Sequence, residues 1–96
     1  MENDIVSRNK GKLMTKTEEA LSDLAKKAII ETLHEGKKKH SPNEFLTHPD
    51  YHLDRAIRHI CTARLIRDGY QGNDTEGING HLRRALTRIA MAIHQT

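Results

Sequence analysis

The chain has 96 residues, 35% of them hydrophobic, with no Trp and one Phe, so it forms one small domain with a core of Ala, Leu and Ile. It carries a formal net charge of +3, and no stretch approaches the roughly 18 apolar residues of a membrane span. The N-terminus lacks the apolar segment of a secretory signal, and a lone cysteine, Cys61, excludes an internal disulfide.

These features predict a cytoplasmic protein without membrane contact. Cys61 is expected to be a small buried hydrophobe. A core built from so few large side chains supplies little stability on its own, which favours completion of the domain by homo-oligomerisation.

The first half of the chain reads as an arm followed by a helix. Residues 1–14 have no sustained apolar period and predict a flexible N-terminal arm. Thr15 and Glu18 have the spacing of a capping box, and Gly36 is a typical helix stop, so a helix is expected over residues 16–35. Its apolar face follows helical spacing: Leu21, Leu24, Ala25, Ala28, Ile29 and Leu33.

A short connector helix is predicted next. Ser41 and Pro42 are typical of a helix start, and His48-Pro49 ends the element because a residue before proline avoids the α region. No alternating strand pattern is recognised anywhere in the chain.

Two further helices are expected in the second half. Asp50 is predicted to cap the first of them, and Gly69 to end it. A glycine-rich loop over residues 69–80 follows, and the last helix is expected to begin near Asn79 or Gly80. The predicted fold is therefore all-α, a small bundle of three main helices plus one short connector helix, with residues 15–96 as a single helical domain.

One cluster of polar residues spans the last two helices. If these helices are antiparallel neighbours, His59 and His81 come close to the acidic loop residues Asp74 and Glu76. Imidazole and carboxylate groups at such positions can bind a divalent ion or transfer protons. The structural alternative is that the acids favour the helix dipole and the histidines are satisfied within the fold.

The basic residues form a second pattern. All eight lysines precede residue 40, whereas seven of the eight arginines lie at or beyond Arg55. Arginine presents a planar fork that suits phosphate and carboxylate. Arg55 and Arg58 share one helix face and Arg84 and Arg88 another, which predicts an anion clamp across a groove. The alternative is solubilisation or intersubunit salt bridges.

The run Lys37-Lys38-Lys39-His40 precedes the predicted helix start at Ser41, where free backbone N–H groups and positive charge suit a phosphate. The alternative is a solvated charge run. No P-loop, Gly-x-Ser-x-Gly or paired-cysteine motif is present, and acids interspersed among the bases argue against nucleic acid as a partner.

Four short segments occur in an order that resembles a known family. They are Gly36 to His40 followed by Phe45, then Ala56-Ile57-Arg58-His59, Asp74-Thr75-Glu76-Gly77, and His81-Leu82-Arg83-Arg84-Ala85. Over residues 20–94 the chain resembles the dATP/dGTP diphosphohydrolase N-terminal domain, a family common in phages. The chain departs from the family's pattern at two positions. Arg84 stands where the family has a second histidine, and His40 stands where it has an aromatic residue.

The resemblance implies kinship with MazG-like all-α pyrophosphohydrolases, which use a metal cluster of helical carboxylates. The helical acids of the first half do not reproduce that arrangement: Glu18, Glu19, Asp23, Glu31 and Glu35. These departures from the family pattern favour a protein that holds a phosphate-bearing nucleotide, such as a cyclic nucleotide immune signal sequestered in an infected host cell, without a required cofactor.

Two alternatives stay open, a Mg²⁺-dependent purine dNTP pyrophosphohydrolase and a structural or DNA-associated phage protein. The expected nucleotide-binding residues are Lys38, Arg55, Arg58, His59, His81 and Arg84. The expected metal ligands, should the protein be an enzyme, are Asp74 and Glu76.

Overall fold

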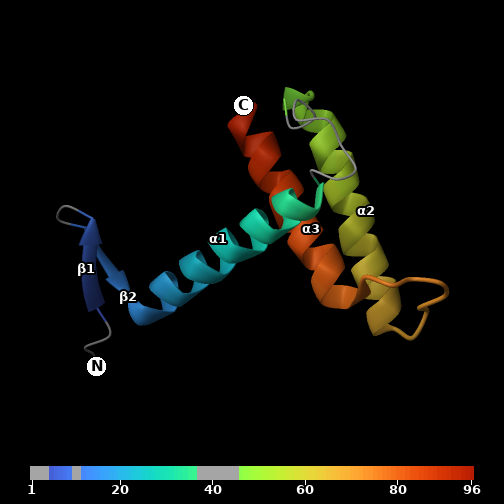
Figure 1. The fold of residues 1–96 in the computed structure, drawn as a ribbon, viewed down its shortest axis with the longest axis horizontal. Helices are drawn as coiled ribbons and strands as arrows, with labels where there is room; N and C mark the ends of the chain where they lie inside the picture. The colour runs from blue at the N-terminus through green and yellow to red at the C-terminus, as the bar shows by residue number, and fades with distance from the viewer. Residues whose placement is uncertain (1–4, 10–11, 37–45) are drawn as a thin grey trace.

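A computed structural model of the chain describes residues 5–9, 12–36 and 46–96. Its elements run in the order β1 (Ile5–Asn9), β2 (Lys12–Thr15), α1 (Lys16–Gly36), α2 (Pro49–Arg67) and α3 (Gly77–His94) (Figure 1). The three long helices confirm the predicted all-α bundle. No helix within the described ranges has the length and apolar character needed to cross a membrane.

The N-terminal segment differs from the expectation that no strand is present. β1 and β2 pair antiparallel, with Ile5 opposite Thr15 and Asn9 opposite Lys12. Each strand is five residues or shorter, and its register is irregular between Ser7 and Asn9, so the segment shows too few alternating positions to reveal a strand by pattern. The hairpin lies at the free end of α1, away from the other helices (Figure 1).

Helix α1 begins where its capping box predicts. The backbone N–H of Glu18 donates to Oγ1 of Thr15 at 3.0 Å, and the backbone N–H of Thr15 donates to Oε1 of Glu18 at 2.9 Å. These reciprocal bonds satisfy N–H groups that have no partner within the helix. The helix ends at Gly36, as predicted.

The connector helix falls on residues that lie mostly outside the described ranges, which resume at Leu46. Helix α2 starts one residue before the predicted cap. His48 is the N-cap, and its Nδ1 accepts from the backbone N–H of Asp50 at 3.1 Å, so the prediction of Asp50 as the cap is wrong. Pro49 takes the first helical position, where its missing N–H costs nothing.

The loop between α2 and α3 starts and ends at glycines with positive φ. Gly69 has φ of 98° just after α2, and Gly77 has φ of 75° at the first residue of α3. A side chain at either position would be strained, which explains the glycine. Helix α3 starts two to three residues earlier than predicted, because a loop carboxylate rather than a residue at 79 or 80 satisfies its first N–H groups.

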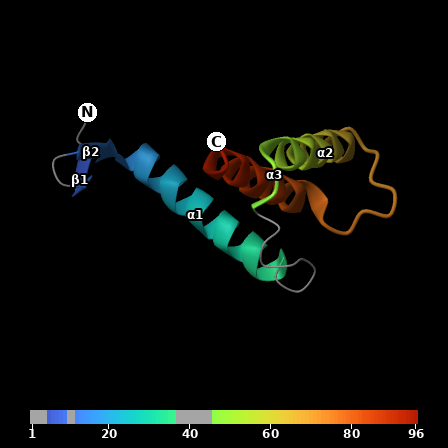
Figure 2. The ribbon, with the colours of Figure 1, turned by 90° about the horizontal axis from the view of Figure 1, so that it is seen from above.

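Helices α2 and α3 form an antiparallel pair, seen side by side in both ribbon views (Figures 1 and 2). The described buried apolar residues are all alanines: Ala28, Ala56, Ala63, Ala85 and Ala92. Small side chains let two helices approach closely. The last turns of α1 pack against α3, and the rest of α1 extends away from the pair.

Most large apolar side chains remain exposed in the single chain. Leu21 and Leu24 of α1 are 60% and 63% exposed, and Cys61 is exposed, so the prediction of a buried cysteine is wrong. The radius of gyration is 16.1 Å, against about 12.5 Å for a compact domain of this length. The predicted core of Ala, Leu and Ile is therefore an alanine core in the isolated chain.

The alanine seam gives a testable prediction. Replacing Ala85, which is buried in α3, with leucine is expected to lower the free energy of unfolding by about 1–3 kcal/mol, because the seam has no room for a larger side chain. Urea denaturation followed by circular dichroism measures the change. The control is Ala20→Leu at an exposed position of α1, and equal effects of the two substitutions would contradict a close-packed seam.

Candidate functional site

The α2–α3 pair brings together the histidines and acids that the sequence singles out. His59 lies in the middle of α2 and His81 in the second turn of α3. Their Nδ1 atoms are 3.0 Å apart and their ring centroids 5.2 Å apart. The predicted meeting of these two histidines beside the acidic loop is therefore confirmed.

Asp74 serves two purposes at the start of α3. Its Oδ2 accepts from the backbone N–H of Gly77 at 2.7 Å and of Glu76 at 3.1 Å, which caps the helix. Its Oδ1 lies 2.5 Å from Nε2 of His81. The bond to His81, followed by the backbone bond from Gly77, lowers the pKa of Asp74, so the carboxylate is ionised and holds a proton on Nε2 of His81.

Glu76 approaches the same histidine from the other side. Its Oε1 is 3.2 Å from Nδ1 of His81, and its Oε2 is 3.6 Å from Nε of Arg84. Gly80 makes this approach possible, because a Cβ at that position would lie only 3.1 Å from Cβ of Glu76. The carboxylate of Glu76 thus lies between the guanidinium of Arg84 and the imidazole of His81.

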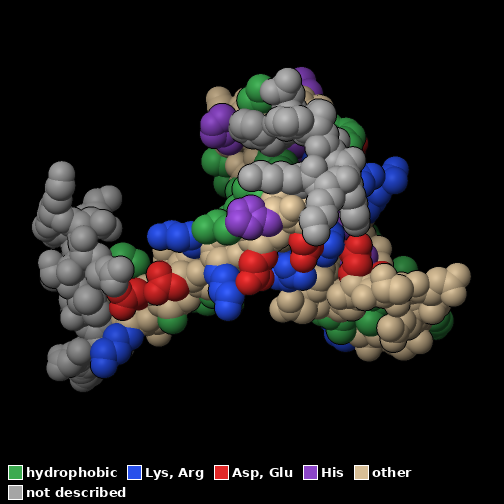
Figure 3. Space-filling view, in the orientation of Figure 1, with side chains coloured by type: hydrophobic (Ala, Val, Ile, Leu, Met, Phe, Trp, Pro, Cys, Tyr) green, Lys and Arg blue, Asp and Glu red, His purple; other side chains and the backbone are tan. Residues whose placement is uncertain are grey.

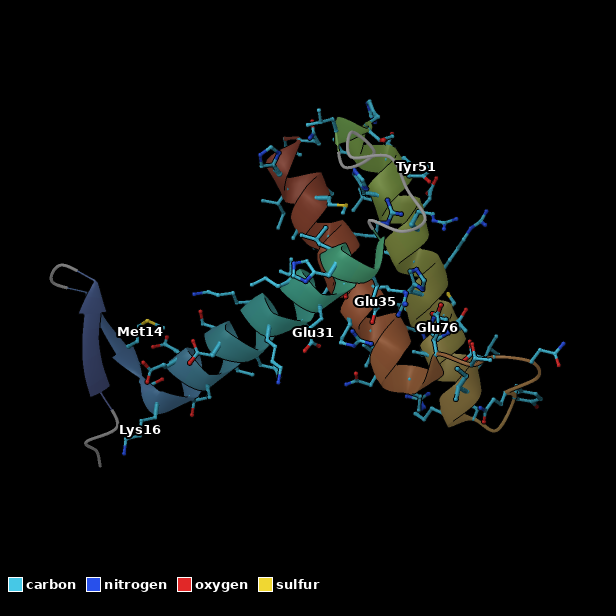
Figure 4. All side chains as sticks on the ribbon, viewed as in Figure 1. Met14, Lys16, Glu31, Glu35, Tyr51 and Glu76 are labelled. Atoms are coloured by element: carbon cyan, nitrogen blue, oxygen red, sulfur yellow. The ribbon has the colours of Figure 1, made fainter. Side chains whose placement is uncertain are left out.

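The last turns of α1 supply two further carboxylates. Nη2 of Arg84 donates to Oε1 of Glu35 at 2.9 Å, and Nη1 of Arg83 lies 3.9 Å from both Glu31 and Glu35. Figure 4 shows Glu31 and Glu35 on α1 and Glu76 near the first turns of α3. Acidic and basic side chains lie next to one another across this part of the surface (Figure 3).

Of the two arginines predicted on α2, Arg55 is the one that contributes to the electrostatics of His59. Arg55 is one helical turn before His59 and half-buried, and Arg58 is exposed. The Nε of Arg55 is buried and has no hydrogen-bond partner among the described residues. A buried N–H group without an acceptor costs about 1–3 kcal/mol, so this atom is a place where an added acceptor would stabilise the protein.

Burial and most of the neighbouring charges disfavour the protonation of His59. Partial burial is the main reason that the pKa of His59 lies below 6.5, and the neighbouring His81 lowers it further. Glu76 acts in the opposite direction, while Arg55 and Arg84 add smaller repulsions. His59 is therefore a neutral imidazole near pH 7, with a lone pair available to a ligand.

The anion clamp predicted from Arg88 is wrong. Arg88 is only 8% exposed, its Nη1 lies 3.1 Å from Nδ1 of His52, and its guanidinium sits over the Tyr51 ring at 5.3 Å. Tyr51 lies at the other end of α2 from Glu76 (Figure 4). Arg88 therefore packs inside the helix pair. Lys38, also predicted to bind phosphate, lies outside the described residues.

The contribution of α1 was not predicted from the sequence. Glu35 and Arg84 are 49 residues apart in the sequence, and they do not belong to the same helix or the same motif. Only the packing of α1 on α3 brings them together. The role of Asp74 as a cap was detectable in principle, because Asp three residues before a helical N–H is a common capping arrangement.

Comparisons with known proteins found no match: no family model, no curated protein and no solved structure matches the chain. The resemblance to the diphosphohydrolase N-terminal domain therefore remains an interpretation of four short segments.

The depressed pKa values predict how stability depends on pH. As pH falls below 6.5, the unfolded chain protonates at His59 before the folded chain does, so stability is expected to decrease. A second decrease is expected below pH 3.8, where the unfolded chain protonates at Asp74 while the folded carboxylate is still ionised. Urea denaturation across pH, with a chelator present, measures both.

His59→Gln should remove the decrease in stability that begins as pH falls below 6.5. His34→Gln, at an exposed position of α1, serves as the control. Direct titration of the His59 ring by NMR gives an independent measure. A midpoint at or above 6.5 would contradict the prediction.

Proposed function

We propose that this protein binds a phosphate-bearing ligand, a nucleotide or cyclic nucleotide, beside His59 on the α2–α3 pair, and holds it rather than hydrolysing it. The observation that carries the proposal is the buried Nε of Arg55, which has no acceptor among the described residues. A phosphate oxygen is the acceptor that a guanidinium binds best. Arg58, His59, His81 and Arg84 would complete the site.

Holding is favoured over hydrolysis by the carboxylates of α1. Glu31 and Glu35 face the guanidiniums of Arg83 and Arg84, and Glu18 is used in the capping box. Carboxylates committed to such partners are poorly placed to bind the Mg²⁺ ions of a MazG-like reaction. Sequestration of a nucleotide signal in the host cytoplasm, as the phage resemblance implies, is the role that we infer.

One assay separates the proposed function from its alternatives. Tag-free protein is incubated with dATP, dGTP or cyclic dinucleotides, with and without Mg²⁺, and the ligand is recovered after heat denaturation. Intact ligand in the protein fraction is expected. Cleaved product would indicate the pyrophosphohydrolase, and the absence of any bound ligand would leave a structural or DNA-associated role.

Substitution of Arg55 is the most direct test of the proposed phosphate site. Arg55→Ala is expected to weaken binding of the retained nucleotide by about 1.5–3 kcal/mol, measured by calorimetry in the presence of a chelator, because a charge-assisted hydrogen bond is lost. Arg64→Ala is the control, since residue 64 lies on the opposite side of α2 and is exposed. Equal affinities of the two variants would remove Arg55 from the site.

Glu35→Gln tests the same site in the opposite direction. Glu35 is half-exposed and holds Arg84 through Nη2 at 2.9 Å. Loss of its charge frees the guanidinium, so phosphate binding is expected to strengthen. A weaker affinity would show that Glu35 organises the site and does not compete with the ligand.

We also propose that the protein is a homo-oligomer. Leu21 and Leu24 are 60% and 63% exposed on the half of α1 that extends beyond the helix pair, and Leu65 and Ile93 are exposed on α2 and α3. Burial of apolar area is the main favourable term in folding and association. A second copy covering α1 would supply the apolar burial that the alanine seam lacks.

Self-association is measured directly by light scattering after gel filtration. A mass at least twice the 11.0 kDa of one chain is expected. Leu21→Glu combined with Leu24→Glu should reduce the mass, because charged side chains do not bury well in an apolar interface. Ser22→Glu, at an exposed position of the same helix, is the control. A monomeric wild-type protein would contradict the proposal.

A further inference from the structure

Three potential metal-ligand atoms converge where α2 meets the start of α3. Nδ1 of His59 is 3.0 Å from Nδ1 of His81, which is 3.2 Å from Oε1 of Glu76. All three donor atoms lie within 4.8 Å of one another, and these residues form the one such group found among the described residues. Asp74 is not a member, although the sequence predicts it as a ligand.

The spacing of these atoms fits a single tetrahedral ion. Ligands about 2.0–2.1 Å from Zn²⁺ at tetrahedral angles lie about 3.3 Å from one another. Two of the three separations, 3.0 Å and 3.2 Å, are close to this value, and the third is at most 4.8 Å. Two imidazole nitrogens this close must otherwise share one proton, and an ion that accepts both lone pairs can take the place of that proton.

The donor types select the metal. Two imidazole nitrogens and one carboxylate favour Zn²⁺, Co²⁺ or Ni²⁺, whereas Mg²⁺ and Ca²⁺ require mainly oxygen ligands. The ligands also leave the site open on one side, because His81 is buried and His59 half-buried, while Glu76 is exposed. Three protein ligands with one open position are typical of zinc sites that bind an exchangeable molecule.

The residues around the cluster orient the ligands. Asp74 accepts from Nε2 of His81, which fixes the tautomer whose Nδ1 lone pair faces His59 and Glu76. Arg84 contacts the second carboxylate oxygen of Glu76, through Nε at 3.6 Å. A carboxylate behind a histidine ligand is a frequent companion of zinc sites, because it fixes the ring and raises its basicity.

We propose that His59, Glu76 and His81 bind one Zn²⁺-type transition-metal ion per chain, with Asp74 as a positioning residue and one coordination position open. This site differs from a Mg²⁺ site built on Asp74 and Glu76 in both its ligands and its metal. It does not depend on the nucleotide proposal, because its test uses the metal alone.

The test starts from tag-free protein freed of metal by a chelator. Titration with Zn²⁺ in a calorimeter is expected to give one ion per chain, and a tenfold excess of Mg²⁺ should not compete. Co²⁺ supplies the second readout, because a tetrahedral site gives visible absorption bands that an octahedral aqueous ion lacks. Zn²⁺ should abolish these bands by displacing Co²⁺.

Variants identify the ligands. His59→Gln is expected to weaken Zn²⁺ binding at least 100-fold, and the control His34→Gln, on an exposed face of α1, should leave it unchanged. Asp74→Asn keeps a residue that caps helices well, and should weaken binding by about 10–100-fold while one ion per chain is retained. Circular dichroism verifies that each variant keeps its helices.

Several results would overturn the proposal. One is weak binding of several ions to the chain, with no tetrahedral Co²⁺ spectrum. Another is an unchanged affinity in His59→Gln, which would assign binding to histidines elsewhere. Should His81→Gln unfold the protein, the half-buried His59 still decides the question, since its replacement leaves the α3 cap intact.

Discussion

The close approach of α2 to α3 is the constraint on which the rest of the molecule depends. Alanines at the seam allow it, and Gly80 leaves room for the side chain of Glu76 at the first turn of α3. Because the helices are near neighbours there, His59 meets His81 at hydrogen-bonding distance. A larger side chain in the seam would separate the helices and, with them, every group of the candidate site.

The same closeness determines the electrostatics of the site. Guanidinium, imidazole and carboxylate groups lie close together here, so each group influences the protonation of its neighbours. Asp74 is ionised because it receives hydrogen bonds from His81 and from the start of α3, whereas His59 stays neutral because it is partly buried beside cations. A neutral imidazole beside an oriented one is the arrangement that a metal ion requires.

A thin seam leaves the chain with little apolar burial of its own. Alanine buries less area than leucine, and the large aliphatic side chains of α1 face outward. Helix α1 therefore contributes to the site through charge, by the contacts of Glu35 with Arg84, more than through core packing. This division explains why a small domain can present a charged site on the helix pair and uncovered apolar side chains on the free half of α1.

Sequence patterns by themselves determined the three long helices, because capping residues and helical periods are local signals that tertiary contacts did not override. Thr15 and Glu18 show this at the start of α1. The same patterns also placed His59, His81 and the acidic loop together, given antiparallel neighbours. They did not reveal β1 and β2, whose strands are too short to show alternation.

Only the tertiary structure decided which polar group does what. Only Thr75 separates Asp74 from Glu76 in the sequence, yet the start of α3 turns Asp74 toward Nε2 of His81 and leaves Glu76 facing Nδ1 of His81. Arg84 and Arg88 share a helix face, yet packing buries Arg88 against His52 and places Arg84 in contact with Glu35 of α1. Such assignments depend on distances between elements, which no local period encodes.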